Sequence, residues 1–369
     1  MEKQAPTEDE RPSLFGLGVS KLEQVAEECG EPPYRGRQIF HALYNHRSIR
    51  FEAMTDLGTT LRQYLTSRFQ IAYPGVREQR VSRDKSVRYL MEFGDGEAAE
   101  AVYMPERDRA TLCLSSQAGC AVDCRFCFTA LMGLRRNLDA GEILGQVYRI
   151  MQDQNIAPGT RLNLVFMGMG EPLLNYDAVL TSVRILADRN GLGIPPRRMT
   201  LSTSGIIPRI QDLGAEEVRP KLAISLNAST SEQRTALMPI NRKYPLDELI
   251  AACRAYPLRP RERLTFEYVM LGGVNDALED AGRLAELLKG VRAKVNLIPY
   301  NPGDELSYRS SPIERVMAFE GVLREAGVPA FIRISRGRDV RAACGQLLVE
   351  GARRPITAIM RPAEFPSLR

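Results

Sequence analysis

Three cysteines lie close together in the first half of the chain: Cys120, Cys124 and Cys127, spaced as C-x-x-x-C-x-x-C. Each thiolate binds one iron of a [4Fe–4S] cluster, so three thiolates leave the fourth iron without a protein ligand. A small molecule can bind that open iron and receive an electron there. A structural zinc site instead uses four protein ligands, usually as two close pairs. The spacing favours a cluster over buried packing or a zinc site completed by Cys113.

A second group of candidate residues follows short apolar runs. Gly170 and Glu171 lie in the motif GMGEP, directly after the run LVFM. Glycines let a ligand approach the backbone closely, and Glu171 offers a carboxylate or a fixed backbone carbonyl to an ammonium group. The ends of later runs contribute Ser202, Ser225-Leu226-Asn227 and Asn301. Their polar side chains would bind a carboxylate and ribose hydroxyls, although each one alone is also an ordinary turn or cap residue.

Two further cysteines stand outside the C-x-x-x-C-x-x-C spacing. Cys113 precedes the three close cysteines, and Cys344 follows an arginine-rich run. A thiolate beside arginines would have a depressed pKa and act as a nucleophile. Buried packing is the alternative for both, as it is for Cys29 and Cys253 on amphipathic segments. Glu100 is one of several acids in its neighbourhood, and the local sequence does not single it out.

The elements that position these residues are predicted from alternating patterns. From residue 111 onward, helical patterns alternate with short apolar runs at 162–170, 198–205, 221–227, 264–271, 294–301 and 330–335. This alternation predicts an α/β fold with a parallel sheet, closed or partly closed into a barrel. The capping box of Asp139 and Glu142 predicts one helix start, and Ser311-Pro312 predicts another. The candidate residues then fall at the carboxyl ends of strands, where such folds carry their chemistry.

The patterns divide the chain into four parts. Residues 1–75 are predicted to form a small N-terminal helical accessory domain, with amphipathic segments interrupted at Gly30 and Pro32-Pro33. Residues 76–105 read as a β-hairpin extension of two strands around Gly94-Asp95-Gly96. Residues 106–345 form the core barrel, and residues 346–369 are a C-terminal tail.

Composition limits the class of protein. The chain has 369 residues, 44% of them hydrophobic, with a net charge of +5. It contains no apolar run of transmembrane length and no secretory signal, so a cytoplasmic protein without a membrane partner is expected. The charge permits an RNA partner. The basic clusters are Arg135-Arg136, Arg197-Arg198, the run from Arg333 to Arg341, and Arg353-Arg354.

Taken together, these motifs resemble the RlmN family of dual-specificity RNA methyltransferases, radical S-adenosylmethionine (SAM) enzymes that methylate C2 of adenosine. The resemblance runs from about Gly30 to Leu347. It includes the three-cysteine motif and the ordered blocks YRGRQIF, GMGEPLLN, TLSTSG, LAISLNA, MPINRKYP, VNLIPYNP and AACGQL. It implies a partial (β/α)6 radical SAM barrel whose cofactors are a [4Fe–4S] cluster and SAM.

The resemblance also implies roles for single residues. It makes Cys120, Cys124 and Cys127 the cluster ligands, and it makes Cys344 the cysteine that is itself methylated. Cys113 would later form a disulfide with Cys344, and Glu100 would accept a proton. The implied SAM contacts are Gly170, Glu171, Ser202, Ser225, Leu226, Asn227 and Asn301. Asn227 stands where some members have histidine.

The implied reaction uses two molecules of SAM. One methylates Cys344, and the other yields a 5′-deoxyadenosyl radical that abstracts hydrogen from the S-methyl group. The carbon radical adds to C2 of adenine, and after proton loss Cys113 attacks the sulfur of Cys344. The implied substrates are 23S rRNA and the adenosine 3′ of the anticodon in tRNA. An electron donor such as flavodoxin and a monomeric state are expected.

Two alternatives remain at this level. The Cfr family methylates C8 of the same adenosine, but it tends to have GMGEA where this chain has Pro172. The other alternative, from a different class, is a non-catalytic RNA-binding protein with a zinc site.

Overall fold

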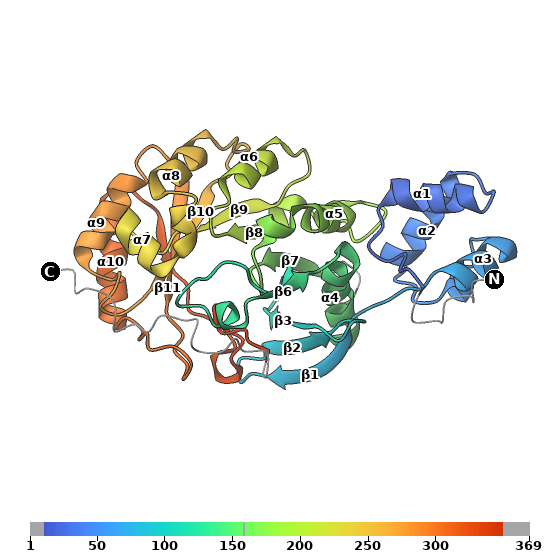
Figure 1. Ribbon diagram of the computed structural model, residues 1–369, viewed down its shortest axis with the longest axis horizontal. Helices are drawn as coiled ribbons and strands as arrows, with labels where there is room; N and C mark the ends of the chain where they lie inside the picture. Colours follow the sequence, from blue (N-terminus) through green and yellow to red (C-terminus); the bar gives the residue numbers. More distant parts are fainter. Residues whose placement is uncertain (1–10, 158, 350–369) are drawn as a thin grey trace.

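The fold is built on one large sheet. The computed structural model describes residues 11–157 and 159–349, and in these residues a ten-stranded sheet has the order β1-β2-β3-β4-β7-β8-β9-β10-β11-β12 (Figure 1). Its strands are β1 Gly75–Val81, β2 Val87–Glu92, β3 Ala98–Pro105, β4 Arg109–Cys113, β7 Arg161–Phe166, β8 Met199–Thr203, β9 Lys221–Ser225, β10 Leu264–Met270, β11 Ala293–Pro299 and β12 Ala330–Ile332.

The strand directions divide this sheet into two parts. From β4 through β7 to β12 every neighbouring pair is parallel, whereas β1, β2 and β3 continue the sheet beyond β4 as antiparallel strands. Among the described residues no pairing joins β1 to β12, so the barrel is not closed. The predicted α/β fold with a partial barrel is confirmed.

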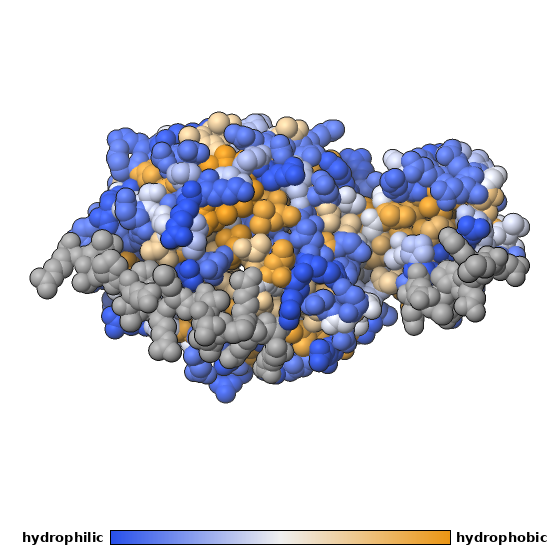
Figure 2. Space-filling view, in the orientation of Figure 1, coloured by the Kyte–Doolittle hydropathy of each residue, from blue (hydrophilic) through white to orange (hydrophobic). Residues whose placement is uncertain are grey.

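Helices connect the parallel strands and cover the outer face of the sheet (Figure 1). They are α4 Ala140–Asp153, α5 Tyr176–Ala187, α6 Ile207–Ala215, α7 Ser231–Leu237, α8 Leu246–Ala255, α9 Leu278–Leu287 and α10 Ile313–Glu325. The capping box of Asp139 and Glu142 begins α4 as predicted, and α10 begins directly after Pro312. Figure 2 shows apolar side chains gathered in the middle of the viewed face, with hydrophilic residues around them.

Short 3-10 turns shape the loops between these elements. They are η2 Phe51–Ala53, η3 Phe128–Met132, η4 Pro172–Asn175, η5 Pro196–Arg198, η6 Pro239–Arg242 and η7 Arg338–Val340. A small separate hairpin pairs β5 Gln117–Gly119 with β6 Leu134–Asn137. This hairpin was not predicted, and it flanks the loop that carries the three close cysteines.

The predicted strands are in the right places, but the predicted runs extend beyond the carboxyl ends of the observed strands. The run 162–170, for example, leaves the sheet after Phe166. A Cβ atom on Gly168 would lie 2.7 Å from the carbonyl oxygen of Leu114. The backbone therefore turns away at close range, and the glycine motif forms a loop above the strand.

Three helices form the N-terminal part: α1 Val19–Glu28, α2 Tyr34–Tyr44 and α3 Thr59–Arg68. The segment before α1 is not helical, because Ser13 forms a β-bridge with Gln70 and Gly16 has φ +108. Tyr44 connects this part to the barrel because its carbonyl accepts from the Tyr148 hydroxyl at 2.7 Å. The apolar residues of both parts belong to one continuous core.

The predicted two-stranded hairpin at 76–105 is wrong in its strand count. The turn at Gly94-Asp95-Gly96 joins β2 to β3 as expected, but a second turn at 82–86 joins β1 to β2. In the sequence, residues 76–92 resemble a single strand because only a few polar turn residues separate β1 from β2. Since β3 pairs with β4, these strands extend the barrel sheet.

Some predictions concern parts that are not described. The Arg353-Arg354 cluster and residues 350–369 of the predicted tail lie outside the described residues. Within 11–157 and 159–349, no helix combines the length and the apolar character needed to span a bilayer.

Candidate active site

A pocket opens at the carboxyl ends of the parallel strands and brings most of the candidate residues together. Those that line it are Cys120, Cys124, Cys127, Gly170, Glu171, Ser202, Ser225, Asn227 and Cys344. The other predicted residues, Leu226, Asn301, Cys113 and Glu100, lie behind or beside its walls. The convergence of separate sequence motifs on one pocket follows from the parallel sheet, because the carboxyl ends of its strands share one edge.

The loop with the three close cysteines is fixed by its own backbone. The Cys120 amide donates to the Gly133 carbonyl at 3.0 Å, and the Cys127 amide donates to the Cys124 carbonyl at 3.0 Å. Gly119, with φ +79, has no room for a Cβ atom, which would lie 1.8 Å from the Gly133 oxygen. The thiols are therefore held on a defined loop between β5 and β6.

The three thiols suit a cluster better than a single ion. Burial raises the pKa of Cys120 to about 12 and also raises the pKa of Cys124 and Cys127. Metal binding must then displace their protons. Among the described residues no three Cys, His, Asp or Glu side chains are grouped to hold one ion. A cluster needs no such convergence, because each thiolate binds a different iron.

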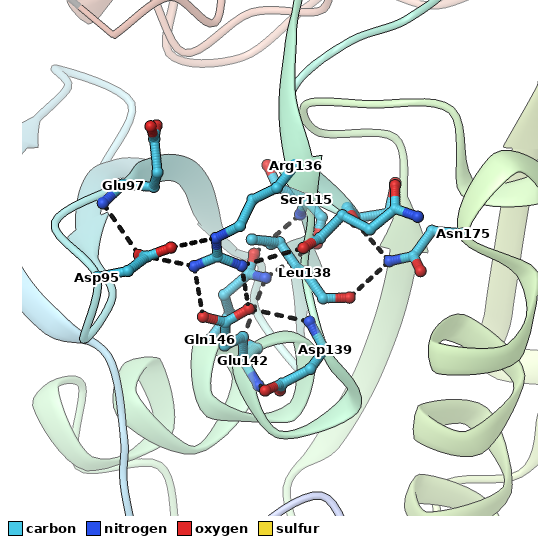
Figure 3. A network of polar contacts seen from close by, with 11 residues as sticks. Asp95, Glu97, Ser115, Arg136, Leu138, Asp139, Glu142, Gln146 and Asn175 are labelled. Atoms are coloured by element: carbon cyan, nitrogen blue, oxygen red, sulfur yellow. Dashed lines mark hydrogen bonds and ion pairs between the residues drawn. The ribbon is translucent and has the colours of Figure 1, made fainter. Parts of the chain in front are cut away.

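Arg136 anchors the hairpin beside the cysteine loop (Figure 3). Its guanidinium donates two hydrogen bonds of 2.7 Å to Glu142 at the start of α4. It also forms an ion pair with Asp95 in the β2–β3 turn. These carboxylates raise the pKa of Arg136, so the charge is retained. This arginine of the predicted basic cluster thus joins three elements that support the site.

Two buried amides fix the backbone on either side of the same loop (Figure 3). Gln146 accepts from the Ser115 amide at 2.8 Å and donates to the Ser115 carbonyl at 2.9 Å. Asn175 donates to the carbonyls of Ser116, at 2.8 Å, and Leu138, at 2.6 Å. Satisfying buried backbone groups in this way keeps the loop ends from moving independently.

Gln117 packs against the GMGEP loop and binds its backbone. Gly170 has φ +101, and a Cβ atom there would lie 2.6 Å from the Cβ of Gln117. The Gln117 side chain accepts from the Glu171 amide at 2.9 Å. The Glu171 carboxylate accepts from the amide and hydroxyl of Ser204 at 2.7 and 2.8 Å. Burial raises the pKa of Glu171, although these hydrogen bonds oppose the rise. In this structure the carboxylate holds the loop.

A row of polar side chains crosses four neighbouring strands along the pocket. The hydroxyls of Ser202 on β8 and Ser225 on β9 are 3.2 Å apart. Ser225 pairs in register with Glu267 on β10, whose carboxylate accepts from Asn296 on β11 at 2.9 Å. Sequence analysis missed Glu267 and Ser204, both of which line the pocket. The inward position of Glu267 in the alternating strand FEYVM was the available signal.

Three of the predicted ligand residues also make contacts within the protein. The Asn227 side chain accepts from the Val269 amide at 2.8 Å, so its oxygen is already used by the protein. Leu226 is fully buried and donates its amide to the Glu267 carbonyl at 3.0 Å. Asn301 donates to the Ser335 hydroxyl at 2.8 Å and to the Cys344 carbonyl at 3.3 Å. Asn301 thus holds Cys344 in place.

Cys344 lies exposed at the edge of the pocket, on a segment bound to the cysteine loop. The Phe128 amide donates to the Gly345 carbonyl at 2.8 Å. The Thr129 hydroxyl donates to the Leu347 carbonyl at 2.8 Å. Cys113, the last residue of β4, is buried. Among the neighbouring ionisable groups, Cys344 has the largest effect on the pKa of Cys113. The fold therefore brings together two cysteines that are far apart in the sequence.

The expected depressed pKa of these two cysteines is wrong. Although the residue as a whole is exposed, loss of solvent around the thiol raises the pKa of Cys344 to about 11, Glu267 adds to the rise, and Arg333 opposes it only in part. Burial also raises the pKa of Cys113. The implied Cys113–Cys344 disulfide is not present, since all seven cysteines are free thiols. The resemblance places that bond at the end of a reaction cycle, and the free pair corresponds to its reduced form.

Glu100 is a buried carboxylate on β3, only 1% exposed. It lies 3.6 Å from the Arg88 guanidinium and accepts from the Leu348 amide at 3.1 Å. Burial raises its pKa to about 7, because the loss of solvent outweighs the effect of Arg88. Leu348 belongs to the segment that follows Cys344, so Glu100 contacts the chain close to the pocket edge.

The arginine-rich run from Arg333 to Arg341 is only partly free for a partner. Arg336 donates to the carbonyls of Pro105, at 2.5 Å, and Asp84, at 2.7 Å. Arg341 binds Glu305 at 2.8 Å. Arg333 and Arg338 are exposed. Arg336 and Arg341 of this run thus hold the C-terminal segment in place, and Arg333 and Arg338 remain available to a partner.

Known families match both parts of the chain. Residues 114–288 match the family model described as the radical SAM superfamily. Residues 13–71 match the one described as the ribosomal RNA large subunit methyltransferase N-terminal domain. The [4Fe–4S] cluster and SAM that serve this superfamily are therefore the cofactors of this chain, and the three thiols on one pocket fit the cluster.

Curated relatives match over nearly their full length. A probable dual-specificity RNA methyltransferase RlmN from Koribacter versatilis is 51% identical, covering 87% of this chain and 97% of that protein. A dual-specificity RNA methyltransferase RlmN from Anaeromyxobacter sp. is 46% identical, covering 94% of this chain and 93% of that protein.

A solved structure agrees with these matches. The radical SAM methyltransferase from Sphaerobacter thermophilus is 44% identical, with a TM-score of 0.86, covering 91% of this chain and 99% of that one. The chain is thus an RNA methyltransferase, and it belongs to the RlmN family of the radical SAM superfamily.

Proposed function

We propose that this enzyme methylates C2 of adenosine by way of a methyl group carried on Cys344. The observation that carries the proposal is the position of Cys344 at the edge of the pocket lined by Cys120, Cys124 and Cys127. Cys113 ends the neighbouring strand β4, and the Cys344 thiol adds to the rise in the pKa of Cys113. A carrier cysteine beside a cofactor pocket and a second thiol beside the carrier are what such a reaction requires.

The cluster and SAM supply, when bound, the methyl group and the one-electron chemistry. In the proposed site Cys120, Cys124 and Cys127 hold the cluster. Gly170 lets SAM approach the backbone, Ser202, Ser225 and Glu267 face it, and Asn296 supports Glu267. Glu171, Leu226, Asn227 and Asn301 support these contacts through the loops that they hold.

The chain's own residues then have separate tasks. Cys344 loses its thiol proton when it accepts the methyl group, and its sulfur later links protein and base. Cys113 attacks that sulfur as a thiolate, so that a disulfide forms while the carbon–sulfur bond to the product breaks and the released carbon takes up a proton. The unpaired electron left by the radical addition would return to the cluster. Glu100 accepts the proton that leaves C2, and its raised pKa of about 7 suits a base at neutral pH.

We further propose adenosines of 23S rRNA and tRNA as substrates. The base must leave its stack to reach the pocket, as for other enzymes that modify bases. Residues 1–75 and 76–105 would act as accessory parts for RNA, and residues 106–345 as the catalytic barrel. A cytoplasmic monomer reduced by a donor such as flavodoxin is expected.

Mass spectrometry of the nucleoside after reaction with defined rRNA and tRNA fragments tests the proposal. We expect 2-methyladenosine from both RNAs when SAM and a reductant are supplied. 8-Methyladenosine would overturn the C2 assignment in favour of the alternative that Pro172 argues against. Product from rRNA alone would remove tRNA from the proposal.

A further inference from the structure

Arg234 is a fully buried cation directly behind the pocket wall. It lies on α7 and is 0% exposed. Its guanidinium donates to the carbonyls of Ser204 and Ser225, and to the side-chain oxygen of Asn241 at 3.1 Å. Ser204 and Ser225 line the pocket. The charge therefore sits one layer of backbone away from the space that the cofactors occupy.

No carboxylate compensates this charge. In residues 11–157 and 159–349 no acidic oxygen lies within 4.0 Å of Arg234, and its Nε has no hydrogen-bond partner. Burying an arginine that has only neutral partners is costly, and natural interiors normally pair such a charge. Burial lowers the pKa of Arg234 to about 10, and the thiol of Cys124 is the largest opposing influence. A negative charge that would compensate Arg234 is therefore missing from the described protein residues around it.

The packing independently connects α7 to that loop. The Arg125 amide donates to the Leu237 carbonyl, the last residue of α7, at 2.9 Å. Phe126 belongs to the same apolar cluster as Leu237 and Met238, with Cys124 packed against it. The helix that carries Arg234 and the loop that carries the thiols are therefore one packed unit.

We propose that Arg234 is the buried counter-charge of the iron–sulfur cluster and a positioning residue that makes reduction of the cluster easier. A cluster on three thiolates is negative overall, and reduction adds one electron and a further negative charge. Net charge and buried neighbours set the reduction potential of such clusters. A fixed cation behind the pocket favours the reduced form, with the electron coming from a one-electron reductant. The inference rests on the proposed assignment of the three cysteines as cluster ligands.

The test compares three variants of the full chain after anaerobic reconstitution. Arg234→Met removes the charge and the hydrogen bonds, whereas Arg234→Lys keeps the charge but cannot form all the hydrogen bonds. Arg219→Met is a matched control. Arg219 is 5% exposed and donates to the Tyr256 hydroxyl at 2.7 Å, and it lies before β9, at the opposite end of the strand from the pocket.

The readouts are iron and sulfide content, SAM binding and the midpoint potential from a dithionite titration followed by electron paramagnetic resonance. For Arg234→Met we expect roughly a tenfold fall in the ratio of reduced to oxidised cluster at a fixed potential, or about 59 mV for one electron. The Arg234→Lys and Arg219→Met proteins should stay near the wild-type potential.

The possible outcomes are distinguishable. Equal potentials in Arg234→Met and wild type, with the cluster intact, would overturn the counter-charge role. A potential that shifts equally in Arg234→Met and Arg234→Lys would make Arg234 only a clamp between strand ends. If Arg234→Met does not fold, an unshifted potential in Arg234→Gln would serve equally to reject the proposal. Absence of a cluster in the wild type would instead defeat the proposed function itself.

Discussion

Two groups of cysteines reach the same pocket by different routes. Cys120, Cys124 and Cys127 come from one short loop, and their arrangement is fixed by local backbone hydrogen bonds. Cys113 ends β4, whereas Cys344 follows β12 almost at the other end of the barrel. Only the closing of the sheet toward a barrel brings this pair together.

The difference shows how each group depends on the rest of the molecule. The loop thiols need the small β5–β6 hairpin and its anchors, Arg136, Gln146 and Asn175. The Cys113–Cys344 pair depends on contacts of the C-terminal segment, such as those from Phe128, Thr129 and Asn301. We therefore expect the first group to bind a cofactor even when the second is removed, so that single variants separate cofactor binding from methyl transfer.

The largest effect is expected from removing a thiol of the loop. Cys124→Ala should abolish both the cluster and SAM cleavage, since two thiolates hold a cluster poorly. Iron and sulfide analysis with the visible absorbance spectrum measures this. Cys253→Ala is the matched control, because Cys253 is buried on α8 and does not line the pocket, and that variant should keep about four irons per chain. A Cys124→Ala protein that still binds the full cluster would remove Cys124 from the ligand set.

The second effect separates the other pair. Cys113→Ala should keep the cluster but stop the reaction late, leaving RNA covalently attached to Cys344, because no thiol remains to attack the Cys344 sulfur. A gel shift that ribonuclease trims but does not remove measures the adduct, and mass spectrometry locates it. Cys344→Ala, also with an intact cluster, should form neither adduct nor product. Normal turnover by Cys113→Ala would make Cys113 a packing residue.

A smaller effect is expected at Glu100, which touches the segment after Cys344. With a pKa of about 7, Glu100 is a carboxylate only above neutral pH, so methylation should rise as pH increases through 7. Glu100→Gln should remove this rise of the rate with pH and slow methylation by roughly 10²- to 10⁴-fold. Rates from pH 6 to 8.5 under single-turnover conditions measure it. If the methylation rate of the variant still rises with pH through 7, a group other than Glu100 is responsible for the pH dependence.

Stability gives an independent check on the same carboxyl group. Because the folded-state pKa is raised above the usual 4.5, the protonated form is favoured by folding. The contribution of the protonated Glu100 carboxyl to the free energy of unfolding is complete below pH 4.5 and is lost as the pH rises through about 7. The free energy of unfolding of the wild type, compared with Glu100→Gln, should therefore fall across that window. Urea unfolding at pH 5 and pH 8 measures the difference.

The sequence predicts the local features well and the non-local ones poorly. The capping box at Asp139 and the strand runs depend on neighbouring residues, and the structure confirms them. The pKa directions of Cys113 and Cys344 were wrong because burial, set by distant elements, outweighs nearby arginines. Alternation in the strand around Glu267 shows which face that residue lies on but not that a pocket lies there, and Arg234 in a short helix gives no local sign of burial.

The predicted RNA surface shows the same limit, because a run of arginines does not say which ones are free. Arg336 holds Asp84 and the Pro105 carbonyl, whereas Arg338, two residues on, is exposed. The smallest effect should therefore come from Arg338→Ala, which should weaken RNA binding a few-fold and reduce its salt dependence, while the unfolding temperature stays constant.

Arg336→Ala is the contrasting variant in this comparison. It should lower the unfolding temperature, because it removes the ion pair with Asp84 and the hydrogen bond to the Pro105 carbonyl. Binding isotherms with an rRNA fragment at several salt concentrations, together with thermal unfolding, separate the two roles. If Arg338→Ala binds RNA with unchanged affinity and salt slope, the run serves only to fix the segment that carries Cys344. The carrier cysteine would then be positioned by arginines whose charge plays no part in recognising the substrate.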